Sequence, residues 1–183
     1  MAKKTGIIGY PFATWTKGRM PITWNIADVL NLEWQTAHHR DDAMNQKLAS
    51  LGHNYESMVI DICQQDQALP SWCYDIADSM NLSKPAAALH RMRPGKYLPL
   101  HSDLYGAYKR INNITTQTIT RIIVFLEDHK PGHMLDIDSD VICKWSAGDW
   151  VSWEDDTIHA AYNMGTEDRY TLQITGHTHN ETR

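Results

Sequence analysis

The sequence predicts a mainly β fold, a sandwich or barrel with helices packed on one face, and three observations point to it. From residue 86 onward, eight short runs of β-prone residues alternate with turn signals, which is typical of all-β sandwiches and barrels. Before residue 86 the apolar spacing is partly helical. With 183 residues, the chain can bury roughly 70% of its surface in one core. We therefore divide it into an N-terminal helical or mixed support region (1–85), a β core (86–176) and a polar tail (177–183), within one compact domain.

Two helices are expected in the support region. Asp41 can cap a helix in which Met44 and Leu48 lie on one face at four-residue spacing. A second helix is expected over residues 70–82, which Pro85 would close. Between the two helices, residues 58–63 form a short apolar run that fits either a strand or a helix.

The β core is expected to contain eight strands. Turn signals such as Pro94-Gly95, Pro131-Gly132 and Ser139-Asp140 separate them, and a polar loop is expected after the second strand, through Asn113. The expected strands span residues 86–93, 97–103, 118–127, 133–138, 141–145, 149–154, 157–163 and 169–175.

Composition excludes several classes of protein. Apolar residues make up 42% of the chain and charged residues 21%, as in an ordinary globular domain. A net charge of −5 argues against a nucleic-acid binder, which needs a concentrated basic face. No apolar run approaches the roughly 20 residues of a membrane span. The 3 cysteines lack a CxxC pair, and residues 3–11 do not read as a signal peptide, so we expect a cytoplasmic protein.

The chemistry of the chain is concentrated in a His-x-Asp pair and a distant histidine. His101 and Asp103 would project from the same face of a strand, with leucines on the opposite face. His159 follows in an uncharged segment and is the candidate partner. Two histidines and one carboxylate form the facial triad of non-haem Fe(II) enzymes, whereas zinc more often takes three or four N or S ligands.

An arginine follows the second histidine at a spacing that could place it near a metal-bound ligand. Arg169 lies ten residues after His159, across a turn at Gly165. If these strands formed an antiparallel pair, Arg169 would lie roughly 10 Å along the sheet from the position opposite His159. A guanidinium there could hold a carboxylate whose other end is on the metal. Thr171 shares the face of Arg169 and could add a hydroxyl donor.

Taken in order, these segments resemble the Fe(II)/2-oxoglutarate-dependent oxygenases, and especially the small branch that includes the prolyl hydroxylases. The resemblance covers roughly residues 89–176. It is carried by residues 94–103 (PGKYLPLHSD), 121–126 (RIIVFL) and 146–151 (SAGDWV), and by His159 with the later segment 169–171 (RYT). The resemblance implies a double-stranded β-helix, the jelly-roll or cupin-like barrel.

The resemblance also implies site residues and cofactors. His101, Asp103 and His159 would bind Fe(II), Arg169 and Thr171 would hold 2-oxoglutarate, and O₂ would take the remaining metal position. Hydroxylation of the substrate would release succinate and CO₂. An arginine in the region of Arg110 also resembles one that approaches the co-substrate in the aspartyl/asparaginyl β-hydroxylases. The candidates for co-substrate or substrate contact are Arg110, Arg121, Tyr97, Tyr105, Trp153 and His133.

Several functional interpretations stay open. The leading one is hydroxylation of a peptidyl or amino-acid-like substrate, and its nearest rival is the same chemistry on a free small molecule or nucleobase. Pro131-Gly132-His133 stands where many relatives carry a Gly-Gly pair, so the substrate of the prolyl hydroxylases does not carry over. A cupin-like metal enzyme without 2-oxoglutarate would not need Arg169, and a non-catalytic barrel would tolerate Asp103→Ala. The sequence leaves the substrate, the oligomeric state and the role of residues 1–85 open.

Overall fold

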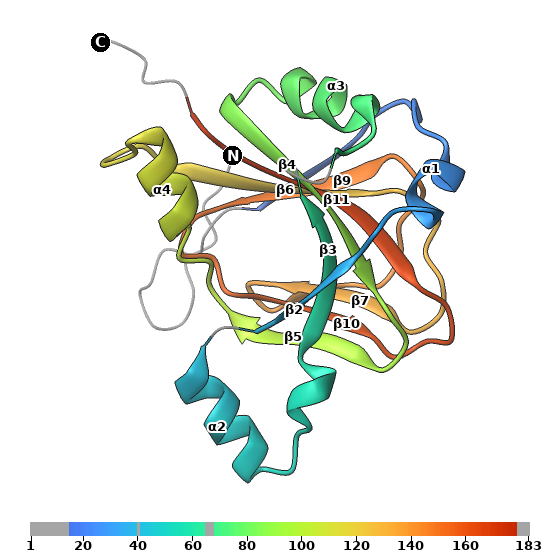
Figure 1. Cartoon of the computed structure of the whole chain (residues 1–183), viewed down its shortest axis with the longest axis vertical. Coiled ribbons are helices and arrows are strands. Elements are labelled where there is room, and N and C mark those ends of the chain that lie inside the picture. The colour runs from blue at the N-terminus through green and yellow to red at the C-terminus, as the bar shows by residue number, and fades with distance from the viewer. Residues whose placement is uncertain (1–14, 40, 65–67, 179–183) are drawn as a thin grey trace.

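Two antiparallel β-sheets face each other, with helices at the periphery, in a computed structural model that describes residues 15–39, 41–64 and 68–178 (Figure 1). This is the mainly β architecture that the sequence predicts. The larger sheet has seven strands in the order β1-β9-β6-β11-β4-β3-β2, and the smaller has four in the order β5-β10-β7-β8. Within the described residues, no helix is long and apolar enough to cross a membrane.

The strands and helices have the following bounds. The strands of the larger sheet are β1 (Thr16–Arg19), β2 (Gln35–His38), β3 (Val59–Gln64), β4 (Ser83–Met92), β6 (Ile119–Phe125), β9 (Asp149–Glu154) and β11 (Arg169–His177). Those of the smaller sheet are β5 (Lys96–His101), β7 (His133–Ile137), β8 (Asp140–Ile142) and β10 (His159–Asn163). The helices are α1 (Ile26–Leu30), α2 (Asp42–Ser50), the 3₁₀ turn η1 (Tyr55–Ser57), α3 (Ser71–Ser79) and α4 (Gly106–Asn112).

The eight strands expected after residue 85 correspond to β4–β11, with small shifts at their ends. The N-terminal region differs more from expectation, because β1, β2 and β3 extend both edges of the seven-stranded sheet. The ambiguous apolar run around residues 58–63 is therefore a strand. Pro85 does not close a helix but lies within β4, which begins at Ser83.

Both helices that the sequence predicted are present, and one of them has a side-chain cap. The Asp41 side chain accepts a hydrogen bond from the Met44 amide at 2.9 Å and so caps α2. α3 begins directly after Pro70. The expected polar loop after β5 instead contains the short helix α4, whose C-cap, Asn113, has a left-handed conformation with φ 55°.

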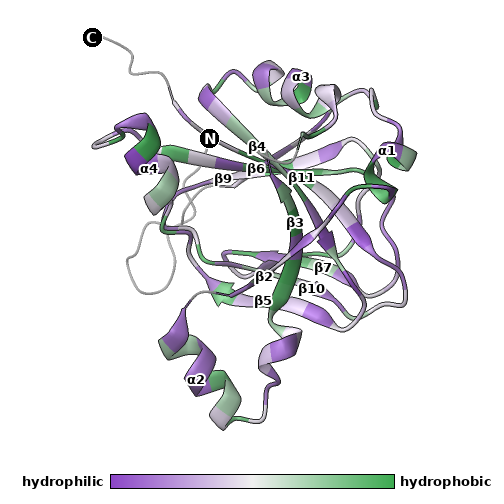
Figure 2. Cartoon of the chain, viewed as in Figure 1, coloured by the Kyte–Doolittle hydropathy of each residue, from purple (hydrophilic) through white to green (hydrophobic). Residues whose placement is uncertain are grey.

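The seven-stranded sheet separates two apolar clusters. Its outer face packs against α3, α1 and Trp24, and its inner face packs against the smaller sheet. α2 lies at the opposite end of the molecule from α3 (Figure 1), and it is mostly hydrophilic, whereas β3 is hydrophobic along much of its length (Figure 2). The expectation that the N-terminal helices share one face is therefore not met, because the weakly apolar α2 does not cover the sheet.

The strands before and after Gly165 do not pair with each other. β10 belongs to the small sheet and β11 to the large one, so the expected antiparallel hairpin between them is wrong. The connection crosses from one sheet to the other, and it is tight, because a Cβ on Gly165 would clash with the Pro131 carbonyl oxygen. Arg169, the first residue of β11, therefore lies on the large sheet, whereas His159 lies on the small sheet that faces it.

The expected polar tail begins later than residue 177. His177 is the last residue of β11, is buried, and its Nδ1 lies 2.9 Å from the Tyr108 hydroxyl. The rest of the expected tail, from residue 179, lies outside the described residues, as does the segment 3–11.

Candidate metal centre

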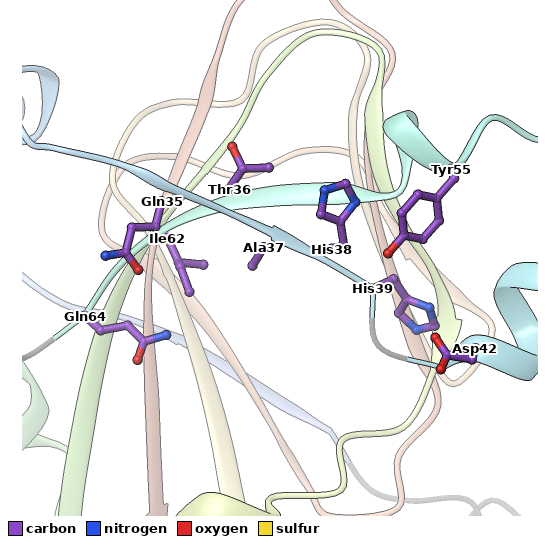
Figure 3. Close-up of a pocket in the computed structure, with 9 residues that line it drawn as sticks. All are labelled: Gln35, Thr36, Ala37, His38, His39, Asp42, Tyr55, Ile62 and Gln64. Carbon is purple, nitrogen blue, oxygen red and sulfur yellow. The ribbon is translucent and has the colours of Figure 1, made fainter.

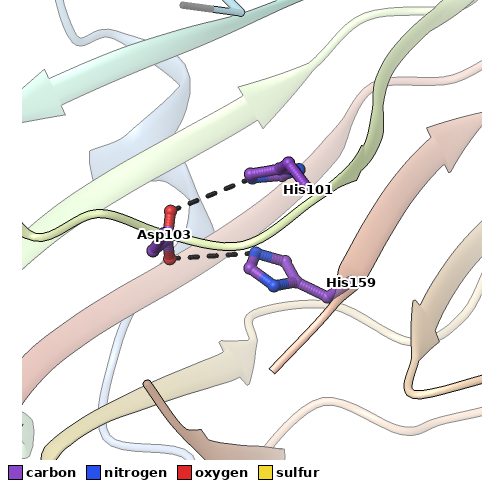
Figure 4. Close-up of side chains that lie close together, drawn as sticks. All are labelled: His101, Asp103 and His159. Atoms are coloured by element: carbon purple, nitrogen blue, oxygen red, sulfur yellow. Dashed lines mark ion pairs between the residues drawn. The ribbon is translucent and has the colours of Figure 1, made fainter. Parts of the chain in front are cut away.

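Two histidines and an aspartate converge between the sheets (Figure 4). His101 ends β5 and His159 begins β10, and these two residues are direct partners in the small sheet. Their ring centroids lie 4.4 Å apart. Asp103 reaches them from just beyond the end of β5, and one ligand atom from each residue lies within 4.8 Å of the others. The predicted triad is therefore brought together.

The local backbone differs from the expected regular strand. A register shift between His159 and Ala161 places Leu98 opposite Ala161, and Leu98 packs into the inner cluster. Leu100 and Leu104 are 48% and 86% exposed. The expectation of an apolar face opposite His101 is therefore wrong, because the bulge breaks the period-two alternation.

Both histidines are fixed with one nitrogen directed at the site. The Nδ1 atoms of His101 and His159 donate to the carbonyl oxygens of Pro99, at 2.7 Å, and Thr157, at 3.0 Å. Each Nε2 is then an acceptor, and each lies 3.8 Å from an oxygen of Asp103. Burial lowers the pKa of both imidazoles, that of His159 to about 4. The rings are therefore neutral near pH 7, which is the form that ligates metals.

The Asp103 carboxylate is shared with a buried arginine. Arg121 on β6 donates to Oδ2 of Asp103 from Nε at 3.0 Å and from Nη2 at 2.6 Å. Its Nη1 contacts the Thr175 hydroxyl, and its guanidinium lies 4.8 Å from the centroid of the Tyr105 ring. Burial alone would raise the pKa of Asp103, but Arg121 and the nearby histidines hold it at about 2. The carboxylate is thus an anion, with Oδ1 on the side of His101.

Arg169 spans the space between the two sheets. Its Nη1 donates to the Met134 carbonyl at 2.7 Å and lies 3.4 Å from that of Tyr162, both in the small sheet. Its Nε is buried without a hydrogen-bond partner among the described residues, although the side chain is a cation whose pKa burial lowers only to about 10. Thr171 shares its face by the alternation of β11 and is also buried. An anionic acceptor would satisfy this cation.

Sequence analysis missed His90. It lies opposite Thr171 in the pairing of β4 with β11. Burial, together with the charges of Arg121 and Arg169, lowers its pKa to about 3, while Asp103 opposes them. His90 is therefore a neutral imidazole among the charged groups of the site. No sequence signal could have found it, because the local sequence of β4 or β11 does not determine the register in which the two strands pair.

Two of the other candidates lie beside the triad. The ring of Trp153 packs 4.7 Å from that of His159, and its Nε1 is buried without a partner among the described residues. Trp153 and Val151 lie in the inner cluster and Trp150 packs on the outer one, as the alternation of side chains along a strand requires. Tyr105 is buried under Arg121.

The remaining candidates lie elsewhere. Tyr97 stacks on Tyr162 and its hydroxyl lies 2.7 Å from Nδ1 of His53, on the side of the small sheet away from Leu98. The Nε2 of His133 lies 3.0 Å from the Glu167 carbonyl oxygen. His133 is the first residue of β7, at the end away from Ile137, which pairs with His159. Arg110 is exposed on α4. No described hydrogen bond or ion pair joins these three candidates to the triad.

Comparison with known proteins gives a likeness of fold. No protein-family model matches the chain, and no curated protein matches it. A solved prolyl-4-hydroxylase from Pseudomonas putida has 14% identity and a TM-score of 0.52, over 84% of this chain and 97% of the other. A 2OG-Fe(II) oxygenase family oxidoreductase from Burkholderia pseudomallei has 12% identity and a TM-score of 0.54, over 84% of this chain and 77% of the other. At these identities the likeness shows the fold alone.

Proposed function

We propose that this protein is a non-haem oxygenase that uses Fe(II), 2-oxoglutarate and O₂. The observation that carries the proposal is the meeting of two neutral imidazole Nε2 atoms and one carboxylate, from His101, His159 and Asp103, within 4.8 Å. This donor set suits Fe(II) and leaves coordination positions open for other ligands. The likeness of fold to two oxygenases supports the same class. We assign the barrel to the double-stranded β-helix type on the same grounds.

We assign the binding of 2-oxoglutarate to residues on the inner face of β11. Arg169 is a buried cation whose Nε lacks a partner among the described residues, and a guanidinium recognises a carboxylate through parallel N–H donors. Thr171 is placed to add a hydroxyl donor from the same face. We assign these two residues to the far carboxylate of 2-oxoglutarate. The neutral His90 adds a donor or acceptor near them without adding charge.

The protein's own residues prepare the reaction. When bound, Fe(II) with 2-oxoglutarate and O₂ supplies oxidation of the substrate, with release of succinate and CO₂. Arg121 holds one oxygen of Asp103 and so orients the other. The buried Trp153 covers His159 and keeps water from that side. The backbone carbonyls of Pro99 and Thr157 fix the tautomers of both histidines.

We propose hydroxylation of a peptidyl or amino-acid-like substrate. The same chemistry on a free small molecule or nucleobase is the alternative, and the acidic chain, with a net charge of −5, weighs against nucleic acid. A cupin-like metal enzyme that does not use 2-oxoglutarate would have the triad but no need of Arg169. Co-substrate binding therefore separates the cupin-like class from the oxygenases.

Anaerobic titration with Fe(II) and 2-oxoglutarate tests the proposal. We expect the weak visible metal-to-ligand charge-transfer band that forms when 2-oxoglutarate chelates the metal. Asp103→Ala should abolish the band, and Asp75→Ala, a matched change at an exposed position on α3, should retain it. Metal binding without a band at saturating 2-oxoglutarate would contradict the oxygenase proposal and favour the cupin-like class.

A further inference from the structure

A hollow lies beside the metal centre, along β2 at one edge of the large sheet. It has a volume of about 540 Å³ and lies among β2, the end of β3, the start of α2 and Tyr55. Figure 3 shows Gln35 and Gln64 at one end, His39 and Asp42 at the other, and Ala37 between them. The pocket is therefore elongated along β2.

His39 joins this pocket to the metal centre. Its ring lines the pocket and lies 5.1 Å from the ring of His101, edge-on at 74°. It is 7% exposed. Asn45 fixes it, because the Asn45 amide donates to the His39 carbonyl at 2.8 Å and its Oδ1 lies 2.9 Å from Nδ1 of the ring. Nδ1 therefore donates to Oδ1 of Asn45.

The backbone of β2 is an edge. β2 is the last strand of the seven-stranded sheet and pairs with β3 on one side, and no strand of the described residues pairs with its other side. An edge strand presents unpaired N–H and C=O groups to any extended chain beside it. From Gln35 to His39 the edge is roughly 13 Å long at ~3.3 Å per residue, which matches about four residues of ligand.

The side chains around this edge suit a polypeptide. Gln35 carries an amide that can donate to and accept from peptide groups, whereas the Thr36 hydroxyl already donates to Oδ1 of Asp61 at 2.8 Å. Asp42 is acidic, and none of the described residues that line the pocket is Lys or Arg. A phosphate-bearing ligand would find no cation here, whereas a neutral or basic segment would. At the same edge, His38 stacks on Tyr55 with its Nδ1 buried and without a partner among the described residues.

We infer that the substrate is an extended, neutral or basic polypeptide segment that pairs with the free edge of β2 and presents its reacting residue to the metal past His39. The inference rests on the proposed oxygenase function. His39 is a positioning residue in this arrangement, since it contacts a metal-ligating side chain and lines the substrate path. The inner part of the barrel is thereby left for the co-substrate on Arg169.

The test uses the full chain with Fe(II) and 2-oxoglutarate, and a positional-scanning library of synthetic nonapeptides as the probe. The charge-transfer band is recorded first, without peptide. Succinate release is then measured with each peptide pool and, separately, with free amino acids and with single-stranded oligonucleotides. We expect peptide pools, and basic pools above acidic ones, to raise succinate release at least tenfold.

Two further measurements locate the peptide. With the most active nonapeptide, hydrogen exchange of the β2 amides should slow. Ala37→Phe adds bulk where the middle of the pocket meets the inner cluster and should lower peptide-stimulated succinate release at least tenfold. Circular dichroism and Co(II) binding check that the variant keeps its fold. Ala49→Phe is the matched control, because Ala49 is exposed on α2 and does not line the pocket.

The outcomes separate the two proposals. Absence of the band overturns the oxygenase proposal and this inference with it. A band without stimulation by any peptide pool overturns only the peptide inference, as does stimulation confined to free amino acids or oligonucleotides. Stimulation by a peptide that neither protects β2 nor is affected by Ala37→Phe overturns the placement on β2.

Discussion

The two faces of β11 differ in chemistry although they belong to one strand. Its outward residues, Leu172 and Ile174 among them, are fully buried in the outer cluster beneath α3. Its inward residues Arg169, Thr171 and Thr175 are also buried, but they are polar. An apolar face stabilises the fold directly, whereas a buried polar face is costly unless each group finds a partner. The outer face therefore holds the fold together, whereas the inner face carries the polar groups of the proposed co-substrate site.

The largest expected effect on stability is on the outer face. Leu172→Ala should lower the free energy of unfolding by about 4 kcal/mol, because it leaves a cavity in a fully buried site. Urea denaturation measures the loss. Co(II) affinity of the folded variant should stay near that of the wild type. A large loss of metal affinity with little loss of stability would contradict the division between the faces.

The next effect is on the inner face. Asp103→Ala should destabilise the metal-free protein by about 3 kcal/mol, since it leaves Arg121 as a buried charge without its carboxylate. We take the low end of the usual range because the Asp103 side chain is 23% exposed. Replacing Arg121 with Met in the same chain should recover much of this loss. If the double variant were no more stable than Asp103→Ala, the unpaired charge would not be the cause.

A pH dependence of stability should follow from the buried imidazoles. The pKa of His90 is lowered to about 3 in the folded protein. Below about pH 6.5 this imidazole is therefore protonated in the unfolded chain but stays neutral in the folded one. Stability is therefore lost as pH falls from about 6.5 towards 3, by roughly 1.4 kcal/mol per pH unit for each such group. His90→Gln should reduce the slope of unfolding free energy against pH by one proton between pH 4 and 6. An unchanged slope would show that His90 titrates alike in both states.

The smallest effect concerns a single hydroxyl. Thr171→Val removes a donor while keeping the shape of the side chain, and should weaken 2-oxoglutarate binding by about 1 kcal/mol, or roughly fivefold in Kd. Isothermal titration of the Co(II)-loaded protein measures it. Thr115→Val, at an exposed loop position, serves as the control. Equal affinities for Thr171→Val and the wild type would remove Thr171 from the co-substrate site.

Local patterns in the sequence predicted most of the elements. The eight strands from β4 to β11 and the helices α2 and α3 follow from turn residues, apolar spacing and a capping aspartate. What the sequence could not supply was the partner of each strand. The segments around Gly165 look like a hairpin, yet β10 and β11 belong to different sheets, since the choice between pairing and crossing depends on all the other strands.

The site shows the same limit. His101, Asp103 and His159 could be chosen by residue type and spacing, and the fold brings them together. The bulge in β5 and β10 that orients them could not be seen. His90 and His39 were missed because neither belongs to a local motif. The pairing of β4 with β11 places His90 opposite Thr171, and hydrogen bonds to Asn45 of α2 hold His39 in place.

The proposed roles of the two inward arginines, Arg121 and Arg169, can be compared in one binding experiment. Kd values for Co(II), and for 2-oxoglutarate on the Co(II)-loaded protein, are determined for Arg121→Gln and Arg169→Gln. Since Arg121 holds the carboxylate of Asp103, a proposed metal ligand, its loss should weaken Co(II) binding by about 10- to 100-fold. Arg169→Gln should leave the Co(II) Kd near that of the wild type and weaken 2-oxoglutarate binding by about 10- to 100-fold, as expected for a lost charged hydrogen bond. Unchanged 2-oxoglutarate affinity in Arg169→Gln, or equal effects of both variants on both ligands, would contradict the account.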